Sequence, residues 1–261
     1  MLQFGKIAII GAGNVSYTLC KLLKDKDIEP FCVFVRNDSE AAKMRADLNV
    51  ETVSDYEKVM LSDLAIIAVN DDAISEVASH LVDYKGLAVH TSGTRPSETL
   101  SEIERYGVFY PLQTMSKGRE IAFDDVPILI YANMPDDLIR LRGFSAALSS
   151  KVEYCDDEQR KAVHLAAVYF SNFTDVMLEI GAKILKDNGL DLSMIRHLVK
   201  ETMQKAFEMS PEKALTGPAR RGDMETIENH MKMLEKYPEE QDIYKLLTNF
   251  ILEKYHENEK L

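Results

Sequence analysis

A glycine-rich turn near the start of the sequence has the residue types and the spacing needed to bind a phosphate. Gly11, Gly13 and Ser16 follow the apolar run Ile7–Ile10, and a helical pattern over Val15–Leu23 comes next. The first glycine permits a tight turn, the second lets backbone N–H groups approach a diphosphate, and a small third residue lets helix and strand pack closely. The helix N-terminus adds partial positive charge. This order of strand, turn and helix predicts a dinucleotide-binding turn, and a tight turn without a nucleotide is the alternative. The predicted turn comprises Gly11, Ala12, Gly13, Asn14 and Val15.

The next apolar run, Phe31–Val35, ends in residues that favour one nicotinamide cofactor over the other. At this point of such a fold an acidic side chain accepts hydrogen bonds from the ribose of NAD, whereas a basic one pairs with the 2′-phosphate of NADP. Arg36 stands here and can pair with that phosphate, and Asn37 and Ser39 supply further donors. NADP(H) is therefore the expected cofactor. NAD is the alternative, if Asp38 takes the ribose position instead.

Polar residues follow two more strand-like runs, at the edge where open α/β sheets bind ligands. Leu64–Val69 leads into residues 70–72, and Leu87–His90 leads into residues 91–94. We expect the nicotinamide half of the cofactor at this edge. The alternative for the carboxylates of 70–72 is that one of them caps the next helix, predicted over Ala73–His80. The alternative for His90 is a purely structural hydrogen bond at the strand end. The cofactor-binding residues predicted here are Val69, Asn70, Asp71, His90, Ser92 and Gly93.

Polar side chains also interrupt a long helical pattern over Asp156–Asp187. At about 100° per residue, His164, Ser171 and Asp175 lie within about 20° of one line, and Asn172 lies about 80° to the side. The functional interpretation is a stripe that faces the nicotinamide and supplies proton donors to a substrate carbonyl or imine. The alternative is a set of hydrogen bonds to neighbouring helices, because polar groups in an apolar helix need partners.

A glycine-punctuated loop, residues 215–223, carries two adjacent arginines in an otherwise acidic part of the chain. Arg220 and Arg221 suit an anionic substrate or the phosphates of the cofactor, and structural pairing with nearby carboxylates is an equal alternative. Asp223 is a natural N-cap for the helix that follows, and it shares one helix face with Thr226 and His230.

The order of elements indicates two domains. Up to about residue 154, short β-branched runs alternate with helical stretches, as in a parallel sheet covered on both faces. Further strands are predicted over Val108–Tyr110, 127–130 and 151–154, with a helix over 136–148. Beyond residue 155 only helices are predicted, over Asp156–Asp187, 192–209, 223–236 and 241–256, with breaks at glycines and prolines. We expect an α/β fold, with a Rossmann-type doubly wound parallel sheet over 1–154 and an all-α substrate or dimerisation domain over 155–261.

Composition and charge argue against several kinds of partner and location. The chain has 261 residues, of which 46% are hydrophobic, and a formal net charge of −12. This charge and the lack of a long basic run argue against a nucleic-acid or anionic-membrane partner. No apolar run approaches the roughly 20 residues that cross a bilayer, and the first residues lack the pattern of a signal peptide. The cysteines lie far apart, so we expect a cytoplasmic protein without disulfides, and no metal site is predicted.

The sequence resembles a family of bacterial proteins that join a Rossmann-like domain to a C-terminal helical domain of unknown function. The resemblance spans nearly the whole chain and implies an NADP-dependent oxidoreductase, related in fold to pyrroline-5-carboxylate reductases, ketopantoate reductases and β-hydroxyacid dehydrogenases. It also implies a homodimer formed through the helical domain. The motifs that carry it are Gly-Ala-Gly-Asn-Val at 11–15, His-Thr-Ser-Gly at 90–93, Tyr-Pro-Leu-Gln-Thr at 110–114, His164 with Ser171 and Asn172, and Leu-Thr-Gly-Pro-Ala-Arg-Arg-Gly-Asp at 215–223.

Two departures from these relatives bear on the chemistry. Many members of the family have histidine where this chain has Tyr110, and a phenol donates a proton or hydrogen bond but is a poor base at neutral pH. The β-hydroxyacid dehydrogenases carry a catalytic lysine where this chain has Val168, so that lysine has no counterpart here.

We therefore expect hydride transfer between NADP(H) and a small, polar, anionic carbonyl or imine compound bound between the two domains. His164 is the first candidate for the proton donor, with Tyr110 as a further candidate. Ser171 and Asn172 are expected to orient the substrate, and Arg220 or Arg221 to bind its anionic end. A non-catalytic NADP(H) sensor or scaffold is the alternative of another class, and ketopantoate reductase activity is a narrower version of the first.

Overall fold

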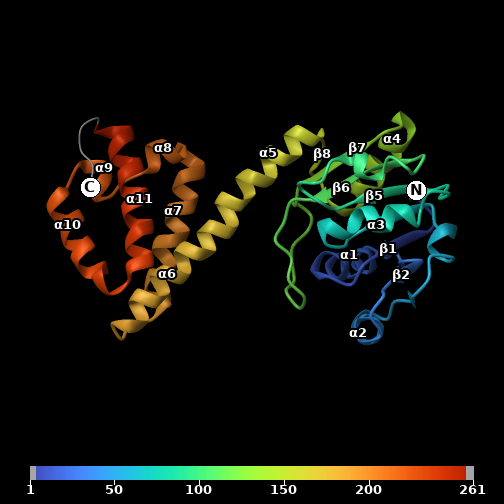
Figure 1. Ribbon diagram of the computed structural model, residues 1–261, viewed down its shortest axis with the longest axis horizontal. Coiled ribbons are helices and arrows are strands. Elements are labelled where there is room, and N and C mark those ends of the chain that lie inside the picture. Colours follow the sequence, from blue (N-terminus) through green and yellow to red (C-terminus); the bar gives the residue numbers. More distant parts are fainter. Residues whose placement is uncertain (1–3, 257–261) are drawn as a thin grey trace. The chain divides into compact units, whose positions relative to one another are not determined.

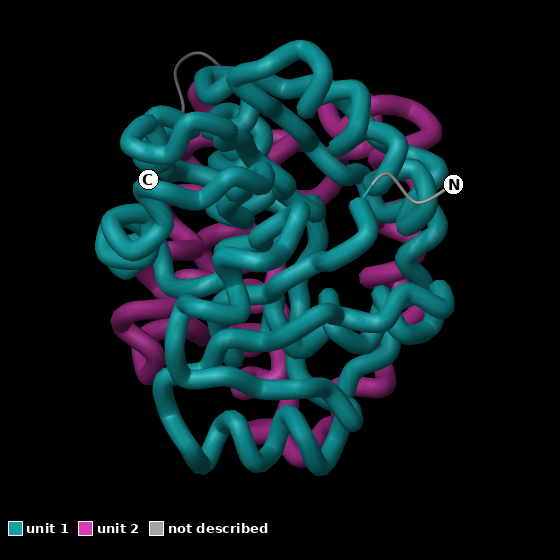
Figure 2. Tube along the Cα trace, turned by 90° about the vertical axis from the view of Figure 1, so that its right-hand side faces the viewer, with its two compact units in different colours: residues 1–171 teal, residues 172–261 magenta. Residues whose placement is uncertain are grey.

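A computed structural model describes residues 4–256, and the chain divides into two compact units, residues 1–171 and 172–261 (Figure 2). The domain boundary predicted near residue 155 stays a prediction. The last strand of the first unit ends at Tyr154, and the helix that begins at Asp157 belongs to the same unit as far as residue 171.

The first unit is built on an 8-stranded sheet in the order β3-β2-β1-β4-β5-β6-β7-β8 (Figure 1). All neighbouring strands are parallel except β6 and β7, which run antiparallel. The predicted fold class, a Rossmann-type doubly wound sheet followed by helices, is confirmed. The strands are β1 Ile7–Ile10, β2 Cys32–Phe34, β3 Thr52–Val53, β4 Leu64–Ile67, β5 Leu87–His90, β6 Tyr106–Pro111, β7 Ile128–Ala132 and β8 Val152–Tyr154. The two-residue strand β3 was not predicted.

Alternation along the strands gives the sheet two apolar faces. In β1, Ile7 and Ile9 pack with the helices α1, α2 and α4, whereas Ala8 and Ile10 pack with α3 on the other face. Successive side chains of a strand point to opposite faces, so a continuous apolar strand needs cover on both sides. The helices of this unit are α1 Asn14–Asp25, α2 Asp38–Leu48, α3 Ile74–Ser79, α4 Pro135–Leu148 and α5 Asp157–Ala167.

The long helix predicted over Asp156–Asp187 is interrupted by one irregular turn. A π-helical segment, Val168–Asn172, separates α5 from α6, Phe173–Asp187. Its i→i+5 hydrogen bonds insert extra residues per turn, and such segments occur often at functional sites. The ideal-helix projection that aligned His164 with Asp175 therefore does not apply across this segment, and that expectation was wrong.

The second unit is helical, and prolines begin several of its helices. Its helices are α6, α7 Arg196–Met209, α8 Pro211–Ala214, α9 Pro218–Arg221, α10 Met224–Met233 and α11 Pro238–Tyr255. The sequence pattern predicts breaks between helices at Pro211, Gly217-Pro218 and Pro238, and each of these prolines is the first residue of a new helix. The missing N–H of proline has no intrahelical acceptor in the first turn, so proline is well accommodated there.

Candidate active site

The glycine turn after β1 has the geometry of a diphosphate cradle. Gly11 has φ of +120°, and a Cβ there would lie 2.3 Å from the Ala68 carbonyl oxygen, so no other residue fits this turn. Gly13, in contrast, has open space within 4 Å of a would-be Cβ. Gly13 is also the N-cap of α1, whose first turn carries no acidic residue. The N-terminal N–H groups of α1 are therefore accessible to an anion above Gly13.

Ser16 explains how this turn works without a third glycine. Its side chain is fully buried, and its hydroxyl donates a hydrogen bond of 2.6 Å to the Gly11 carbonyl oxygen. The hydroxyl thus ties the first turn of α1 to the end of β1, and its polar atom has a partner inside the core.

A pocket of about 330 Å³ lies beside the glycine turn, between the carboxyl ends of β1, β2 and β4. This is the topological switch point of the sheet. From β1 the chain continues to β2 and β3 on one side, and then crosses to β4 and β5 on the other side. The pocket brings together the predicted cofactor residues Gly11, Ala12, Gly13, Arg36, Asn37, Val69 and Asn70.

Arg36 and its neighbours form the rim of this pocket. The Arg36 guanidinium is 66% exposed and makes an ion pair of 2.9 Å with Glu76. The Asn37 side-chain oxygen caps α2 by accepting from the N–H groups of Ser39 and Glu40, and it also accepts from the Ser39 hydroxyl. Asp38, the residue that would favour NAD, is the first residue of α2 and does not line the pocket.

The carboxylates after β4 hold the loop after β5. Asp71 accepts a hydrogen bond of 2.7 Å from the Thr94 hydroxyl, and Asp72 pairs with Arg95. Neither side chain caps a helix, so the capping alternative raised by the sequence was wrong. Their partners instead belong to the loop after β5, which is distant in the sequence. The two carboxylates therefore join this loop to the carboxyl end of β4. Ser92 lies in that loop and accepts from the N–H groups of Thr94 and Arg95.

His90 contacts the same loop through both nitrogen atoms of its ring. Its side chain is fully buried, its Nδ1 accepts from the Ser92 N–H at 3.2 Å, and its Nε2 lies 3.3 Å from the Pro96 carbonyl oxygen. This pairing places the proton on Nε2. Burial, and secondarily the charge of Arg160, lowers the pKa of His90 to about 4, so the ring is neutral. The described geometry gives His90 a structural contact and no exposed atom for a ligand.

Tyr110 and His164 form a polar pair beside Gly93 at the same edge of the sheet. The Tyr110 hydroxyl lies 3.0 Å from His164 Nδ1, although 54 residues separate them in the sequence. A Cβ at Gly93 would lie 2.4 Å from this Nδ1, so the imidazole rests directly on the glycine backbone. Burial raises the pKa of Tyr110, with Arg160 opposing the shift, so the phenol is protonated at neutral pH. A protonated phenol next to an imidazole can deliver a proton to a reacting atom.

The position of His164 is set by the first turns of α5. Arg160 precedes His164 by four residues, so both side chains lie on the same helix face. The Arg160 side chain is fully buried, pairs with Asp157 at 2.7 Å and donates to the Arg95 carbonyl oxygen. Asp157 in turn accepts from the Ser97 N–H at 2.8 Å. These contacts dock α5 onto the β5 loop and place His164 over it.

Four of the remaining predicted residues lie at the start of α1 or in the π-helical segment. Val15 packs partly buried against the core, and Asn14 accepts a hydrogen bond of 3.4 Å from the Lys117 N–H. Ser171 and Asn172 lie in the π-helical segment, where Asn172 is exposed.

The two predicted arginines lie in the second unit, and both have local contacts. The Arg220 guanidinium lies 3.9 Å from the centre of the Tyr255 ring, and Arg221 approaches Asp223 at 3.8 Å. Asp223 caps α10 through the Thr226 N–H, as its sequence position predicted.

Sequence reasoning missed several residues of the cofactor pocket. Tyr56 lines it from the segment after β3 and stacks on Phe34, with ring centres 4.2 Å apart. Glu40 lines it from the first turn of α2 and pairs with Lys117. An isolated tyrosine and a helix-start glutamate carry no motif, and only the fold brings them to the glycine turn.

The described part of the chain holds neither a metal-binding cluster nor a membrane-spanning helix. Between residues 4 and 256, no group of three or more His, Cys, Asp and Glu side chains is arranged to hold a metal ion. Over the same residues, every helix is too short or too polar to span a bilayer.

Comparison with known proteins gives two family matches. Residues 6–89 match the family described as NADP oxidoreductase, coenzyme F420-dependent, and residues 126–251 match a domain of unknown function, DUF2520. No curated protein sequence matches the chain.

Solved structures extend these matches over nearly the whole chain. A Bacteroides fragilis protein designated a candidate NADP oxidoreductase is 36% identical over 97% of this chain and 100% of its own, with a TM-score of 0.90. A pyrroline-5-carboxylate reductase from Coxiella burnetii is 16% identical over 98% of both chains, with a TM-score of 0.59. A reductive aminase from Aspergillus terreus, solved with NADPH and ethyl levulinate, is 15% identical over 97% of this chain and 94% of its own, with a TM-score of 0.71. The last two share the fold alone. The chain therefore belongs to the family of the Bacteroides fragilis protein, oxidoreductases in which a Rossmann domain of the NADP oxidoreductase type is joined to a DUF2520 domain.

Proposed function

We propose that the protein transfers hydride between NADP(H) and a small anionic compound with a C=O or C=N group. The observation that carries this proposal is the Tyr110–His164 pair, which rests on Gly93 at the sheet edge that also holds the glycine turn. A part-buried proton donor at that edge is what a reductase needs, and a cofactor sensor has no use for it.

The residues present fit the cofactor. The open space above Gly13 and the uncapped N-terminus of α1 suit a diphosphate, and the pocket lined by Tyr56, Arg36 and Asn37 suits the adenosine with its 2′-phosphate. The nicotinamide half would then lie over the carboxyl ends of β4 and β5, near Asn70, Ser92 and Gly93. The B. fragilis relative and the NADPH-bound reductive aminase support the choice of NADP over NAD.

The chain supplies the proton in this reaction. When bound, the cofactor supplies a hydride to the electrophilic carbon of the substrate, or accepts one in the reverse direction. If the Tyr110 hydroxyl donates to His164 Nδ1, then His164 Nε2 carries a proton outward. That proton passes to the carbonyl oxygen or imine nitrogen as the C–H bond forms, which leaves an alcohol or an amine. As the Nε2 proton leaves, Tyr110 gives its own proton to Nδ1 and becomes a phenolate, and a proton from solvent then restores the pair.

The substrate class is suggested by fold relatives and by charge. Pyrroline-5-carboxylate, named for the Coxiella burnetii reductase, is an imine with a carboxylate, and the other fold relative is named a reductive aminase. In this chain Arg220 and Arg221 are the proposed partners of a substrate carboxylate, and Ser171 and Asn172 the proposed residues that orient it. Each arginine already has one local contact, so binding an anion would compete with Tyr255 and Asp223.

We also propose a homodimer formed through the helical unit. Its buried apolar core consists of little beyond Ala219, Ile227 and Leu252, whereas Leu246 and Phe250 on one face of α11 are 71% and 66% exposed. Exposed apolar stripes of this kind are common at dimer interfaces. Light scattering of the unaltered protein should give twice the chain mass, and Phe250→Glu should shift it toward the monomer. A monomeric unaltered protein would rule the dimer out.

The cofactor proposal is tested by titration of the protein with NADPH and with NADH. We expect tighter binding of NADPH, and a loss of about tenfold or more in NADPH affinity for Arg36→Ala with little change for NADH. Arg142→Ala, which removes the same charge from an exposed position of α4, is the matched control and should bind NADPH like the unaltered protein. Tighter NADH binding to the unaltered protein would reverse the choice of cofactor.

A further inference from the structure

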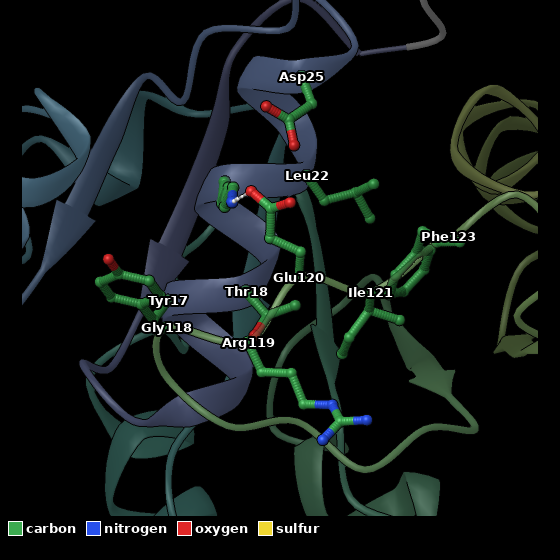
Figure 3. A pocket seen from close by; sticks show the side chains of 11 residues that line it. Tyr17, Thr18, Leu22, Asp25, Gly118, Arg119, Glu120, Ile121 and Phe123 are labelled. Carbon is green, nitrogen blue, oxygen red and sulfur yellow. Dashed lines mark hydrogen bonds and ion pairs between the residues drawn. The ribbon is translucent and has the colours of Figure 1, made fainter.

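The segment between β6 and β7, residues 112–127, runs along α1 and is called the strap here. Lysines and carboxylates hold it in place: Lys21 of α1 pairs with Glu120 at 2.8 Å, and Lys26 pairs with Asp124 at 2.7 Å. Figure 3 shows the strap residues from Gly118 to Phe123 lying against α1, with the dashed line at Glu120 marking its ion pair. These contacts join the strap to the second half of α1 and its C-cap residue.

The first part of the strap reaches the glycine turn. The Lys117 backbone N–H donates to the side chain of Asn14, the first residue of α1, at 3.4 Å. The Lys117 ammonium lies 2.8 Å from the Glu40 carboxylate, in the first turn of α2. The lysine therefore extends from the N-terminus of α1 to the first turn of α2, across the position where a dinucleotide would lie.

Glu40 is an unexpected residue for the rim of a phosphate-binding pocket. It lines the same pocket as Arg36 and Asn37, the residues proposed to bind the 2′-phosphate. Lys117 holds one Glu40 oxygen at 2.8 Å, and Lys43 holds the other at 2.7 Å. These two lysines lower the pKa of Glu40 to about 2, so it is ionised at neutral pH and would repel a phosphate unless its lysines are shared.

We propose that Lys117 is a phosphate-binding residue of the cofactor site and exchanges the Glu40 carboxylate for the 2′-phosphate of NADP(H). The inference rests on the proposed cofactor. Both partners are partly exposed, at 38% for Lys117 and 30% for Glu40, and ion pairs with this exposure contribute little to stability, so the exchange is easy. A phosphate offers more negative charge and three acceptor oxygens, which makes it the stronger partner. The strap thus adds to the cofactor site a residue from outside the strand, turn and helix of the motif.

The test compares two adenosine nucleotides that have the same number of phosphates, of which only one nucleotide has a phosphate at the 2′ position. Adenosine 2′,5′-bisphosphate carries the 2′-phosphate and adenosine 5′-diphosphate lacks it, and each is titrated calorimetrically into the full-length protein and its variants. Lys117→Met should weaken the 2′,5′-bisphosphate about tenfold and leave the 5′-diphosphate within about twofold. Glu40→Gln should strengthen the 2′,5′-bisphosphate about threefold or more, because a competing negative charge is removed.

The matched control is Lys21→Met, which removes the same charge and also loosens the strap, but away from the pocket. It should leave both affinities within about twofold. An unchanged affinity for the 2′,5′-bisphosphate in Lys117→Met, an equal loss for both nucleotides, or a weakening in Glu40→Gln would each overturn the assignment. If the unaltered protein binds neither nucleotide nor NADPH, the proposed cofactor fails and takes the role of Lys117 with it. If only the variant results fail, the proposed cofactor stands.

Discussion

Replacement of Gly93 by alanine tests the contact that positions the proposed proton donor. In the structure the added Cβ would lie 2.4 Å from His164 Nδ1, 2.7 Å from its Cγ and 3.0 Å from its Cβ. Unstrained contacts with carbon lie near 3.5 Å or beyond, so the imidazole must move by about 1 Å. A shift of this size breaks the 3.0 Å contact between His164 and Tyr110.

The expected magnitudes follow from that displacement. Overpacking of a well-filled site costs about 1–3 kcal/mol, so Gly93→Ala should lower the free energy of unfolding by that amount. Misplacement of a reacting group by about 1 Å lowers kcat by about a hundredfold. NADPH affinity should change little, because the backbone N–H of residue 93 is kept.

A double-mutant cycle separates this contact from other effects of the substitution. The free energy of unfolding is measured in urea for the unaltered protein, Gly93→Ala, His164→Ala and the double variant. In the His164→Ala background the ring atoms at 2.4 and 2.7 Å are gone and only the Cβ of residue 164, at 3.0 Å, remains, so Gly93→Ala should cost much less there. An equal loss of stability in both backgrounds would refute the reasoning, because the cost would then come from some neighbour other than His164.

Three more predictions concern the same unit. Tyr110→Phe removes the hydroxyl that His164 Nδ1 contacts, so kcat for a reducible substrate should fall about tenfold with NADPH affinity unchanged, and an unchanged kcat would exclude Tyr110 from proton delivery. His90 has a pKa of about 4 in the fold against 6.5 ordinarily, so the unfolded chain binds the extra proton first as the pH falls. The free energy of unfolding should therefore decline by up to about 3 kcal/mol between pH 6.5 and pH 4, and His90→Asn should flatten that slope in pH-dependent urea melts. Arg105→Met leaves the buried Asp137 carboxylate, 2% exposed, with only Arg140 at 3.7 Å as an ion-pair partner and should cost about 3 kcal/mol in the same assay, whereas a loss below about 1 kcal/mol would mean that Arg140 or water replaces Arg105.

Local sequence patterns indicated several of the residues that line the pocket beside the glycine turn. Gly11, Gly13 and Arg36 follow apolar strands at short range, and strand, turn and helix are fixed by neighbours a few residues apart. The conformation that only Gly11 can adopt is a property of the turn itself. The structure therefore places these residues on one pocket, as the motif predicts.

Contacts between distant segments could not be predicted in the same way. Tyr110 and His164 were singled out separately, but their pairing depends on the docking of α5 onto the β5 loop through Arg160 and Asp157. The projection along an ideal helix failed because a π-helical segment interrupts it, and the sequence carries no simple signal for one.

Asp71 and Lys117 also have partners on segments that are distant in the sequence. Asp71 has the sequence position of a helix cap, but the Thr94 hydroxyl is its partner in the fold. Lys117 has no motif at all, and only the course of the strap brings it to Glu40. When the partner of a side chain lies on another helix, strand or loop, the fold decides which residue that partner is. Local sequence patterns do not reveal it.

The central claim, that the chain is an NADP(H)-dependent reductase of a C=O or C=N group, is tested most directly by isotope transfer. NADPH deuterated at the reactive nicotinamide carbon is incubated with the protein and small anionic carbonyl and imine compounds, and the products are analysed by mass spectrometry. We predict that deuterium appears on the former carbonyl or imine carbon of a product, and that His164→Ala suppresses this transfer while NADPH still binds. Tight NADPH binding with no deuterium transferred to any of these compounds would contradict the account and would favour a protein that senses the cofactor.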